Sequence, residues 1–154
     1  MTIESDIAYL ERIQLFRRLG GGALRILAIG VESYDVQTGQ VLFMAGEAAD
    51  GAYIIKYGSF SLKPEKPGED EVVTGPGTLL GESALFAETK RPATATAREQ
   101  STVMRISRTM FLRMLDGYPE AAARLREMIA SRSNQWTREM QNVRAMLVGD
   151  KDSN

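Results

Sequence analysis

Apolar residues at the start of the chain recur with the spacing of a helix. Their period is close to 3.6 residues, and the positions that set it are Ile7, Leu10, Ile13, Leu15 and Phe16. Because Asp6 is a suitable N-cap, we predict a helix over residues 6–19. Glycines at 20–22 end it, and residues 23–29 are long enough for a short second helix. Residues 1–30 are therefore expected to form an N-terminal helical segment.

From Val31 the apolar period shortens to about two residues, which is typical of strands. The alternation predicts short strands within residues 34–43, 52–62, 71–74, 94–97 and 103–106. We expect one hairpin to turn at Thr38-Gly39 and a second to turn at Gly58. Residues 63–70 combine prolines, a glycine and charged side chains, which indicates an exposed hairpin tip. Short strands separated by glycine turns favour an antiparallel β-roll or sandwich over residues 31–106.

The helical period returns after the last strand. Ser107 is a suitable N-cap for a helix over 108–115, and the sequence Gly117-Tyr118-Pro119 ends that helix. A long helix without internal Pro or Gly is expected over 120–147. Residues 107–148 are thus predicted to form a pair of C-terminal helices, and residues 149–154 a polar tail.

The composition restricts the chemistry that the chain can perform. It has 154 residues, 44% of them hydrophobic and 25% charged, which suits one globular domain. The sequence contains no Cys and no His, so disulfides, thiolate or imidazole metal sites, and Cys or His catalysis are excluded. The net charge of −1 does not favour binding to nucleic acid or to an anionic membrane. The acidic N-terminus and the lack of a long apolar run predict a cytoplasmic protein.

The strongest candidate for a binding site lies between two of the predicted strands. Gly81 and Glu82 open a turn of helix in the sequence Leu80-Gly81-Glu82-Ser83-Ala84-Leu85, and Arg91 follows a short loop. N–H groups at a helix start attract anions, and an Arg guanidinium matches the oxygens of a phosphate. An ionised Glu accepts hydrogen bonds from sugar hydroxyls. The combination is suited to holding a sugar phosphate without reacting with it.

This stretch resembles the phosphate-binding cassette of the cyclic nucleotide-binding domain family, which includes the catabolite activator protein and the regulatory subunits of protein kinase A. The pattern Leu80-Gly81-Glu82 followed by Arg91-Pro92-Ala93-Thr94 has the family spacing without an insertion. The resemblance implies an antiparallel double-stranded β-helix, a jelly-roll-like β-roll, with N-terminal helices and a C-terminal helix pair. It places the cassette at residues 80–94.

The resemblance also implies which residues bind the ligand. Arg91, which should be largely buried, would hold the cyclic phosphate, and Glu82 would accept a hydrogen bond from the ribose. The ligand-binding set it implies is Leu80, Gly81, Glu82, Ser83, Ala84, Arg91, Pro92 and Ala93. No metal or other cofactor is expected, and the implied ligand is a cyclic nucleotide.

Pro92 departs from the pattern of the family. The residue after the Arg commonly donates its backbone N–H to the phosphate in cAMP-binding relatives, and proline has no N–H. Relatives that favour cGMP often have Thr or Ser at this position, so the resemblance favours cAMP over cGMP here. Ser83 is a smaller departure, since many relatives have an apolar residue there.

The predicted long helix has one apolar stripe with three open interpretations. Its members are Leu125, Met128, Ile129, Arg132, Trp136, Met140, Val143 and Leu147. The stripe packs against the β-roll of its own chain, forms the seam of a homodimer, or closes over the ligand as a lid. In the last case Trp136, the only tryptophan, would stack on the base.

The expected function is that of a stand-alone, non-catalytic sensor domain, because the chain ends at Asn154 before any helix-turn-helix. Ligand binding would rearrange the C-terminal helices and act on a protein partner not identified by the sequence, with no role for nucleic acid or membrane. The alternative is a protein-interaction or scaffold module that has kept the fold and lost physiological nucleotide binding.

Overall fold

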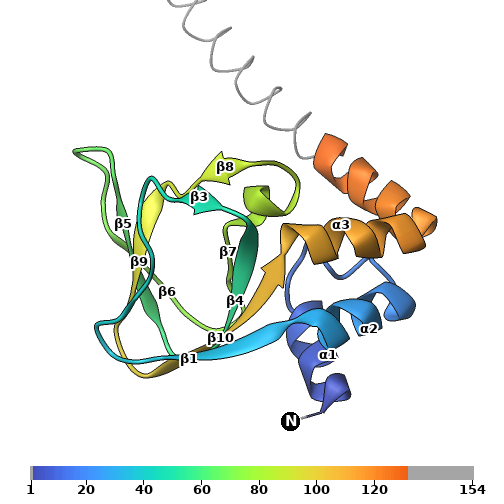
Figure 1. The fold of residues 1–154 in the computed structure, drawn as a ribbon, viewed down its shortest axis with the longest axis horizontal. Helices are drawn as coiled ribbons and strands as arrows, with labels where there is room; N and C mark the ends of the chain where they lie inside the picture. The colour runs from blue at the N-terminus through green and yellow to red at the C-terminus, as the bar shows by residue number, and fades with distance from the viewer. Residues whose placement is uncertain (1, 132–154) are drawn as a thin grey trace, which may run out of the picture.

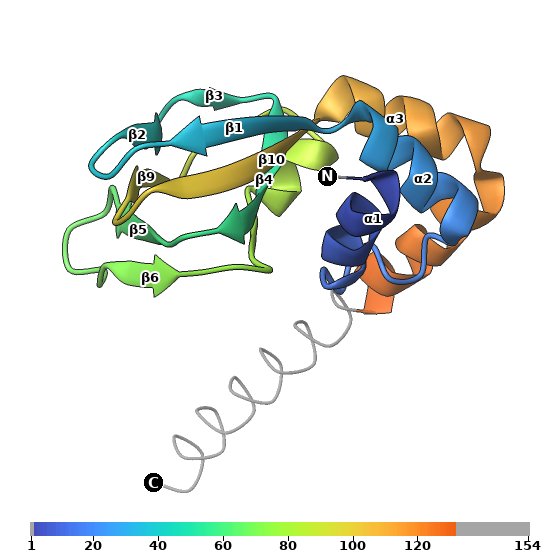
Figure 2. The same ribbon diagram turned by 90° about the horizontal axis from the view of Figure 1, so that it is seen from below.

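Strands and helices occupy separate halves of the molecule, and both views in Figures 1 and 2 show this arrangement. The structure, a computed structural model, describes residues 2–131. Within this range the helices lie at both ends of the sequence and meet beside the strands, where α2 (Gly21–Gly30) packs against α3 (Arg108–Gly117). The predicted class, a mainly β protein with flanking helices, is confirmed.

The strands form two four-stranded sheets and one small ladder, and all their pairings are antiparallel. The first sheet has the order β1 (Glu32–Val36), β10 (Ser101–Ser107), β4 (Gly51–Tyr57), β7 (Leu79–Leu80). The second has the order β2 (Val41–Phe43), β9 (Ala93–Ala97), β5 (Phe60–Pro64), β6 (Val72–Thr74). The small ladder joins β3 (Ala48–Ala49) to β8 (Thr89–Lys90).

Two of the predicted hairpins do not form, although their strands do. β1 pairs with β10 and β2 with β9, while β4 and β5 belong to different sheets. The chain passes from one sheet to the other at each turn, and the turn glycine Gly39 donates its N–H to Ala97 of β9 at 2.8 Å. Because the chain alternates between the two sheets, it winds into a roll. β1 and β2 therefore each pair with a strand distant in sequence and not with each other. The hairpin of β5 and β6, with its tip between them, is confirmed.

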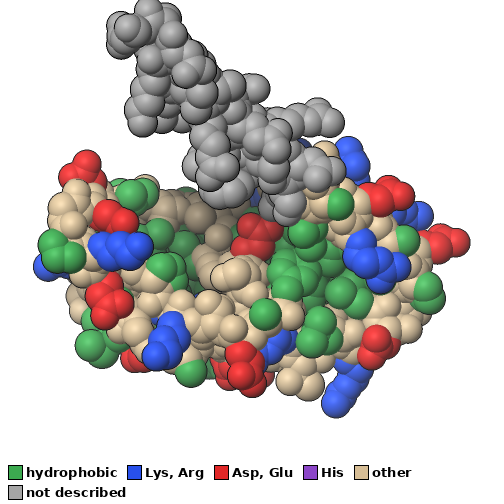
Figure 3. All heavy atoms as spheres, turned by 90° about the horizontal axis from the view of Figure 1, so that it is seen from above, with side chains coloured by type: hydrophobic (Ala, Val, Ile, Leu, Met, Phe, Trp, Pro, Cys, Tyr) green, Lys and Arg blue, Asp and Glu red, His purple; other side chains and the backbone are tan. Residues whose placement is uncertain are grey.

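Charged side chains do not segregate by sign on the face seen in Figure 3. Lys and Arg side chains alternate there with Asp and Glu side chains over both halves of the molecule. That face therefore does not present a field of one sign.

The first sheet separates two hydrophobic cores because successive side chains of a strand point to opposite faces. On β4, Ile55 faces the core between the two sheets, whereas Ile54 faces the core under the helices. On β10, Val103 and Met104 divide in the same way. The central strands of this sheet are consequently buried on both faces.

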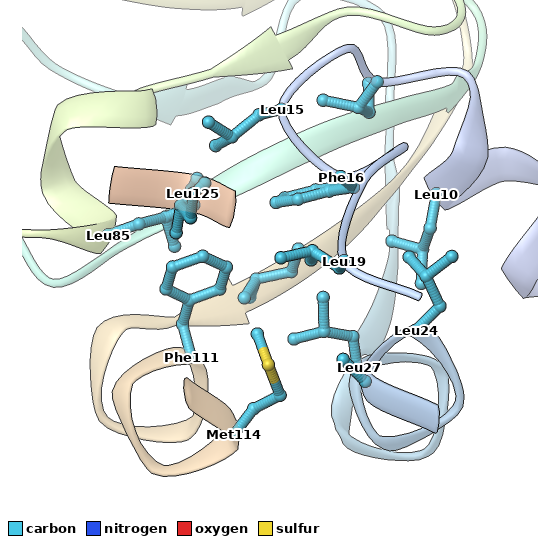
Figure 4. Packing of buried hydrophobic residues seen from close by; sticks show 14 of the residues in the cluster. Leu10, Leu15, Phe16, Leu19, Leu24, Leu27, Leu85, Phe111, Met114 and Leu125 are labelled. Carbon is cyan, nitrogen blue, oxygen red and sulfur yellow. The ribbon is translucent and has the colours of Figure 1, made fainter. Parts of the chain in front are cut away.

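The core under the helices joins segments from the whole chain (Figure 4). Its members shown there are Leu10, Leu15, Phe16, Leu19, Leu24, Leu27, Leu85, Phe111, Met114 and Leu125. Leu85 comes from the cassette and Phe111 from α3, so the candidate site and the helices share one packed cluster. Leu125 and Met128 of the predicted stripe are also buried in it. The stripe positions from Arg132 onward, including Trp136, lie outside the described residues.

The first helix differs from its prediction. α1 spans Ile3–Glu11, and its N-cap is Thr2, whose hydroxyl accepts the N–H of Ser5 at 3.1 Å. Residues 12–19 form turns that direct their apolar side chains into the core, so tertiary packing overrides the helical period. Asp6 is not a cap; its carboxylate lies 3.2 Å from the ammonium of Lys56, a fully buried side chain of β4. This ion pair joins α1 to the first sheet.

The remaining helices follow the prediction closely within the described residues. α2 spans Gly21–Gly30. Ser107 caps α3, because its hydroxyl accepts the N–H of Met110 at 3.1 Å. A further helix begins at Pro119 and is described to residue 131.

Candidate functional site

The cassette opens with a glycine whose backbone conformation suits no other residue well. Gly81 has φ +81° and ψ +38°, in the left-handed region, and it precedes the 3₁₀ helix η1 (Glu82–Leu85). The carbonyl of Gly81 accepts the N–H of Ala84 at 3.0 Å. The N–H groups of Glu82 and Ser83 belong to the first turn, where a helix offers no acceptor of its own. The turn therefore presents backbone N–H donors next to the carboxylate of Glu82.

Arg91 lies where β8 ends and β9 begins, and its backbone is held from both sides. Its N–H donates to the carbonyl of Glu47, and its carbonyl accepts the N–H of Gly46, each at 2.8 Å. Arg91 is only 5% exposed, as the family resemblance implied. The Nη1 atom is buried and has no hydrogen-bond partner among residues 2–131. A buried guanidinium with an unused donor is the arrangement expected of a site that receives an anion.

Seven of the eight predicted ligand-binding residues line one pocket of about 370 Å³. They are Leu80, Gly81, Glu82, Ser83, Arg91, Pro92 and Ala93. Phe43 of β2 and Leu62 of β5 complete the lining. Ala84 is not part of the lining, and its side chain is fully buried. The pocket thus combines a cation, a carboxylate and an apolar wall, as a sugar phosphate with an attached base requires.

The backbone of the cassette and the guanidinium of Arg91 are in direct contact. A Cβ atom placed on Gly81 would lie 2.3 Å from Nη1 of Arg91, far inside van der Waals contact. Glycine is needed at this position both for its positive φ and for the close approach of the side chain.

Burial dominates the electrostatics of Arg91. Desolvation lowers the pKa of its guanidinium, and the nearby Tyr53 and Asp50 partly offset this effect. An Arg stays protonated even so, which leaves a positive charge in a site that is largely removed from water. Asp50 itself forms an ion pair with Arg105 at 2.8 Å, and this bond is the main cause of its lowered pKa.

The cassette is joined to α3 by polar and aromatic contacts. Nη1 of Arg108, the first residue of α3, donates to the carbonyl of Ala87 at 2.9 Å and to those of Ala49 and Ala84 at 3.1 and 3.3 Å. Phe86, directly after η1, meets Phe111 of α3 edge to face, with ring centroids 5.6 Å apart. A displacement of η1 would therefore act directly on α3.

A larger crevice, of about 550 Å³, lies at the other end of the molecule, between the start of α2 and Tyr118. Its cationic residue, Arg124, already bonds the carbonyl of Arg18 and lies 3.6 Å from Glu120. Among residues 2–131 the lining of this crevice contains no unused buried donor of the kind that Arg91 supplies, so the pocket at the cassette is the better candidate.

The sequence did not indicate Phe43, Tyr53 or Arg108 as parts of the site. Phe43 and Tyr53 read as ordinary apolar positions of strands, and Arg108 as a surface residue of a helix. Contacts between segments far apart in the sequence bring them to the cassette: strand pairing places Phe43 and Tyr53, and hydrogen bonds place Arg108. Within the described part of the chain no group of three or more acidic residues is placed to hold a metal ion. None of the helices described there is long and apolar enough to span a membrane.

Comparison with known proteins agrees with this geometry. A family model described as the cyclic nucleotide-binding domain matches residues 35–118. The chain is 41% identical to a cyclic nucleotide-binding-like protein from Brucella abortus, with a TM-score of 0.65, and the match covers 73% of this chain and 98% of that one.

Two curated relatives are much longer than this chain. A lysophospholipase of Aspergillus fumigatus is 28% identical over 66% of this chain but only 7% of its own length. A cAMP-dependent protein kinase regulatory subunit of Yarrowia lipolytica is 30% identical over 70% of this chain and 28% of its own. The chain thus spans less than a third of either relative, and the shared part is a single module. The chain belongs to the cyclic nucleotide-binding domain family.

Proposed function

We propose that this chain is a non-catalytic sensor domain that binds a cyclic nucleotide, with cAMP preferred over cGMP. The observation that carries the proposal is Arg91, a buried cation with an unused donor in a pocket that also contains Glu82. A buried donor without a hydrogen-bond acceptor is costly, and a phosphate oxygen would supply the acceptor for Nη1.

We assign to each polar group of the ligand a partner in the pocket. The cyclic phosphate engages the guanidinium of Arg91 and the N–H groups at the start of η1, where the peptide dipoles also favour an anion. The ribose hydroxyl donates to the carboxylate of Glu82. The base then lies against the apolar part of the lining, to which Leu62 and Leu80 contribute.

Pro92 sets the expected affinity and contributes to the choice of base. It lies at the pocket and has no N–H to donate, so one hydrogen bond to a charged acceptor is absent. Such a bond contributes about 1.5–3 kcal/mol, or about one to two decades in affinity. Proline also has no hydroxyl that could reach a guanine, which leaves cAMP as the preferred nucleotide.

Binding would be transmitted through the contacts between the cassette and α3. When the ligand displaces η1, the carbonyls that Arg108 holds and the ring of Phe86 move with it. The helices after Ser107 then repack, and a partner reads their new position. The ligand can shift this equilibrium only by its difference in affinity for the two arrangements.

Calorimetric titration of cAMP, and separately of cGMP, tests the proposal. The protein is first unfolded and refolded to remove any ligand carried through purification. We expect micromolar or tighter binding of cAMP, weaker binding of cGMP, and no measurable binding in Arg91→Ala. The matched control is Arg98→Ala, since Arg98 is an exposed Arg after β9. Equal affinity of Arg91→Ala and Arg98→Ala for cAMP would show that the site is wrongly assigned.

A second function is favoured by one observation, the proline at position 92. A module that no longer needs to bind phosphate has no use for an N–H there, and it would act through protein contacts alone. The two functions differ in whether a cyclic nucleotide raises the melting temperature of the protein. A ligand that binds only the folded state must raise it, whereas an interaction module without a nucleotide site would show no change. Neither a thermal shift nor binding heat with either nucleotide would favour the interaction module.

A further inference from the structure

Two aromatic rings hold the guanidinium of Arg91. The Cζ atom of Arg91 lies 4.5 Å from the ring centroid of Phe43 and 5.6 Å from that of Tyr53. The two rings lie nearly parallel, with an interplanar angle of 27° and centroids 6.0 Å apart. Phe43 ends β2 in one sheet, and Tyr53 lies within β4 in the other, so the cation sits where both sheets contribute a ring.

Aromatic partners differ from a carboxylate partner in leaving the N–H donors of Arg91 available to a ligand. A carboxylate would occupy the N–H donors of the guanidinium, and an incoming phosphate would have to displace it. An aromatic face attracts the cation through its quadrupole and leaves the N–H donors unused. Nη1 of Arg91 is indeed buried without a hydrogen-bond partner among residues 2–131. The rings therefore compensate part of the desolvated charge and keep donors available.

The rings and the cassette together restrict where the guanidinium can lie. Gly81 touches Nη1 from the side of the cassette, and the backbone of Arg91 is fixed by its bonds to the loop at 46–47. With Phe43 and Tyr53 on the sheets, the side chain has contacts from β2, from β4 and from the start of η1. An ordered cation loses less rotamer entropy when a ligand binds.

We propose that Phe43 and Tyr53 are positioning residues that hold Arg91 ready for the phosphate of the ligand. This inference rests on the proposed function, which supplies the anionic ligand. It assigns to the two rings a part of the binding affinity although neither ring offers a strong hydrogen bond to a phosphate. The rings act through Arg91, and their effect must therefore depend on its presence.

The first test compares ring removal at Phe43 with the same change elsewhere in the same core. Phe43→Leu removes the nearer ring, and Phe60→Leu is the matched control, because Phe60 is a buried Phe of the core between the sheets. At the second ring, Tyr53→Leu is compared with Tyr53→Phe, which keeps the aromatic face. We expect Phe43→Leu and Tyr53→Leu to weaken cAMP binding by about threefold to thirtyfold, as desolvated cation–π contacts imply. Phe60→Leu and Tyr53→Phe should bind as the wild type does.

The second test measures whether the rings act through the cation, in protein without ligand. Urea unfolding of wild type, Phe43→Leu, Arg91→Met and the double variant forms a cycle that isolates the coupling between the two side chains. Phe43→Leu should destabilise the fold, and the change in the unfolding equilibrium constant measures by how much. We expect this change to be about threefold to thirtyfold smaller in the Arg91→Met background than in the protein that keeps Arg91.

The outcomes separate this inference from the proposed function. If the wild type binds cAMP but Phe43→Leu binds as tightly as Phe60→Leu, the inference is wrong and the proposed function stands. Additive effects in the unfolding cycle also overturn it. If the wild type binds neither nucleotide, the proposed function fails, and the role of the rings in binding affinity fails with it. The urea-unfolding cycle then still decides whether Phe43 holds the guanidinium of Arg91.

Discussion

Replacing Gly81 by Ala should damage ligand binding far more than it damages the fold. The new methyl group would have two consequences in the structure. A residue with a side chain would have to adopt the φ of +81° that Gly81 has. The added carbon would also lie 2.3 Å from Nη1 of Arg91. The atom that it meets is the far end of a flexible side chain, so the guanidinium can move away.

The magnitudes of the two consequences differ. Left-handed backbone costs an Ala about 1–2 kcal/mol of stability relative to Gly. To restore ordinary contact, Nη1 must retreat from 2.3 Å to about 3.4 Å, a shift of about 1 Å. A shift of that size breaks a charge-assisted hydrogen bond, which is worth about 1.5–3 kcal/mol. Affinity for cAMP should therefore fall by about tenfold to a hundredfold.

The matched control is Gly39→Ala. Gly39 has φ +84°, close to that of Gly81, but a Cβ atom there would meet nothing within 4 Å. Urea unfolding should give similar losses of stability for the two variants, while calorimetry should show weakened cAMP binding only for Gly81→Ala. Equal cAMP affinities in the two variants would refute the reasoning, because the contact between Gly81 and Arg91 would then play no part in the site.

Further predictions concern the phosphate site, its link to α3 and one ion pair. Pro92→Ala restores an N–H and should tighten cAMP binding by about tenfold or more, measured by calorimetry; unchanged affinity would mean that no phosphate oxygen lies within reach. Arg108→Ala should reduce the change in amide exchange that cAMP causes in α3, whereas Arg113→Ala, at an exposed position of the same helix, should leave it intact. The hydrogen bond to Arg105 lowers the pKa of Asp50. This pair therefore stabilises the fold at pH values above the usual pKa of an Asp, about 4, and the stabilisation is lost as the pH falls through the lowered pKa of Asp50. Asp50→Asn should therefore cost less than about 1 kcal/mol at pH 7, because the side chain is 72% exposed and water screens the pair, and should cost nothing in strong acid.

Much of the fold was predictable because its determinants are local. The alternation of apolar residues places the strands, and Ser107 caps α3 where its sequence context indicates. The contiguous stretch from Leu80 to Ala93 contributes Gly81, Glu82 and Arg91 to one pocket, so the polar groups of the site are close together in the sequence. Their final placement also depends on residues 46–47, which hold the backbone of Arg91 by two hydrogen bonds.

Other features depended on contacts between residues far apart in the sequence. Residues 12–19 have a helical period but form turns, because their apolar side chains reach the core better that way. Two of the predicted hairpins did not form because their strands pair across the roll, at a sequence separation that no local pattern encodes.

The sequence by itself determined most of the element types and the polar groups of the pocket, which follow from neighbours along the chain; residues 12–19 are the exception. Tertiary structure alone decided which rings surround Arg91 and which carbonyls Arg108 holds. The physical reason is that burial and cation–π contact depend on distance in space. The winding of the two sheets sets that distance for Phe43 and Tyr53, and sequence spacing does not.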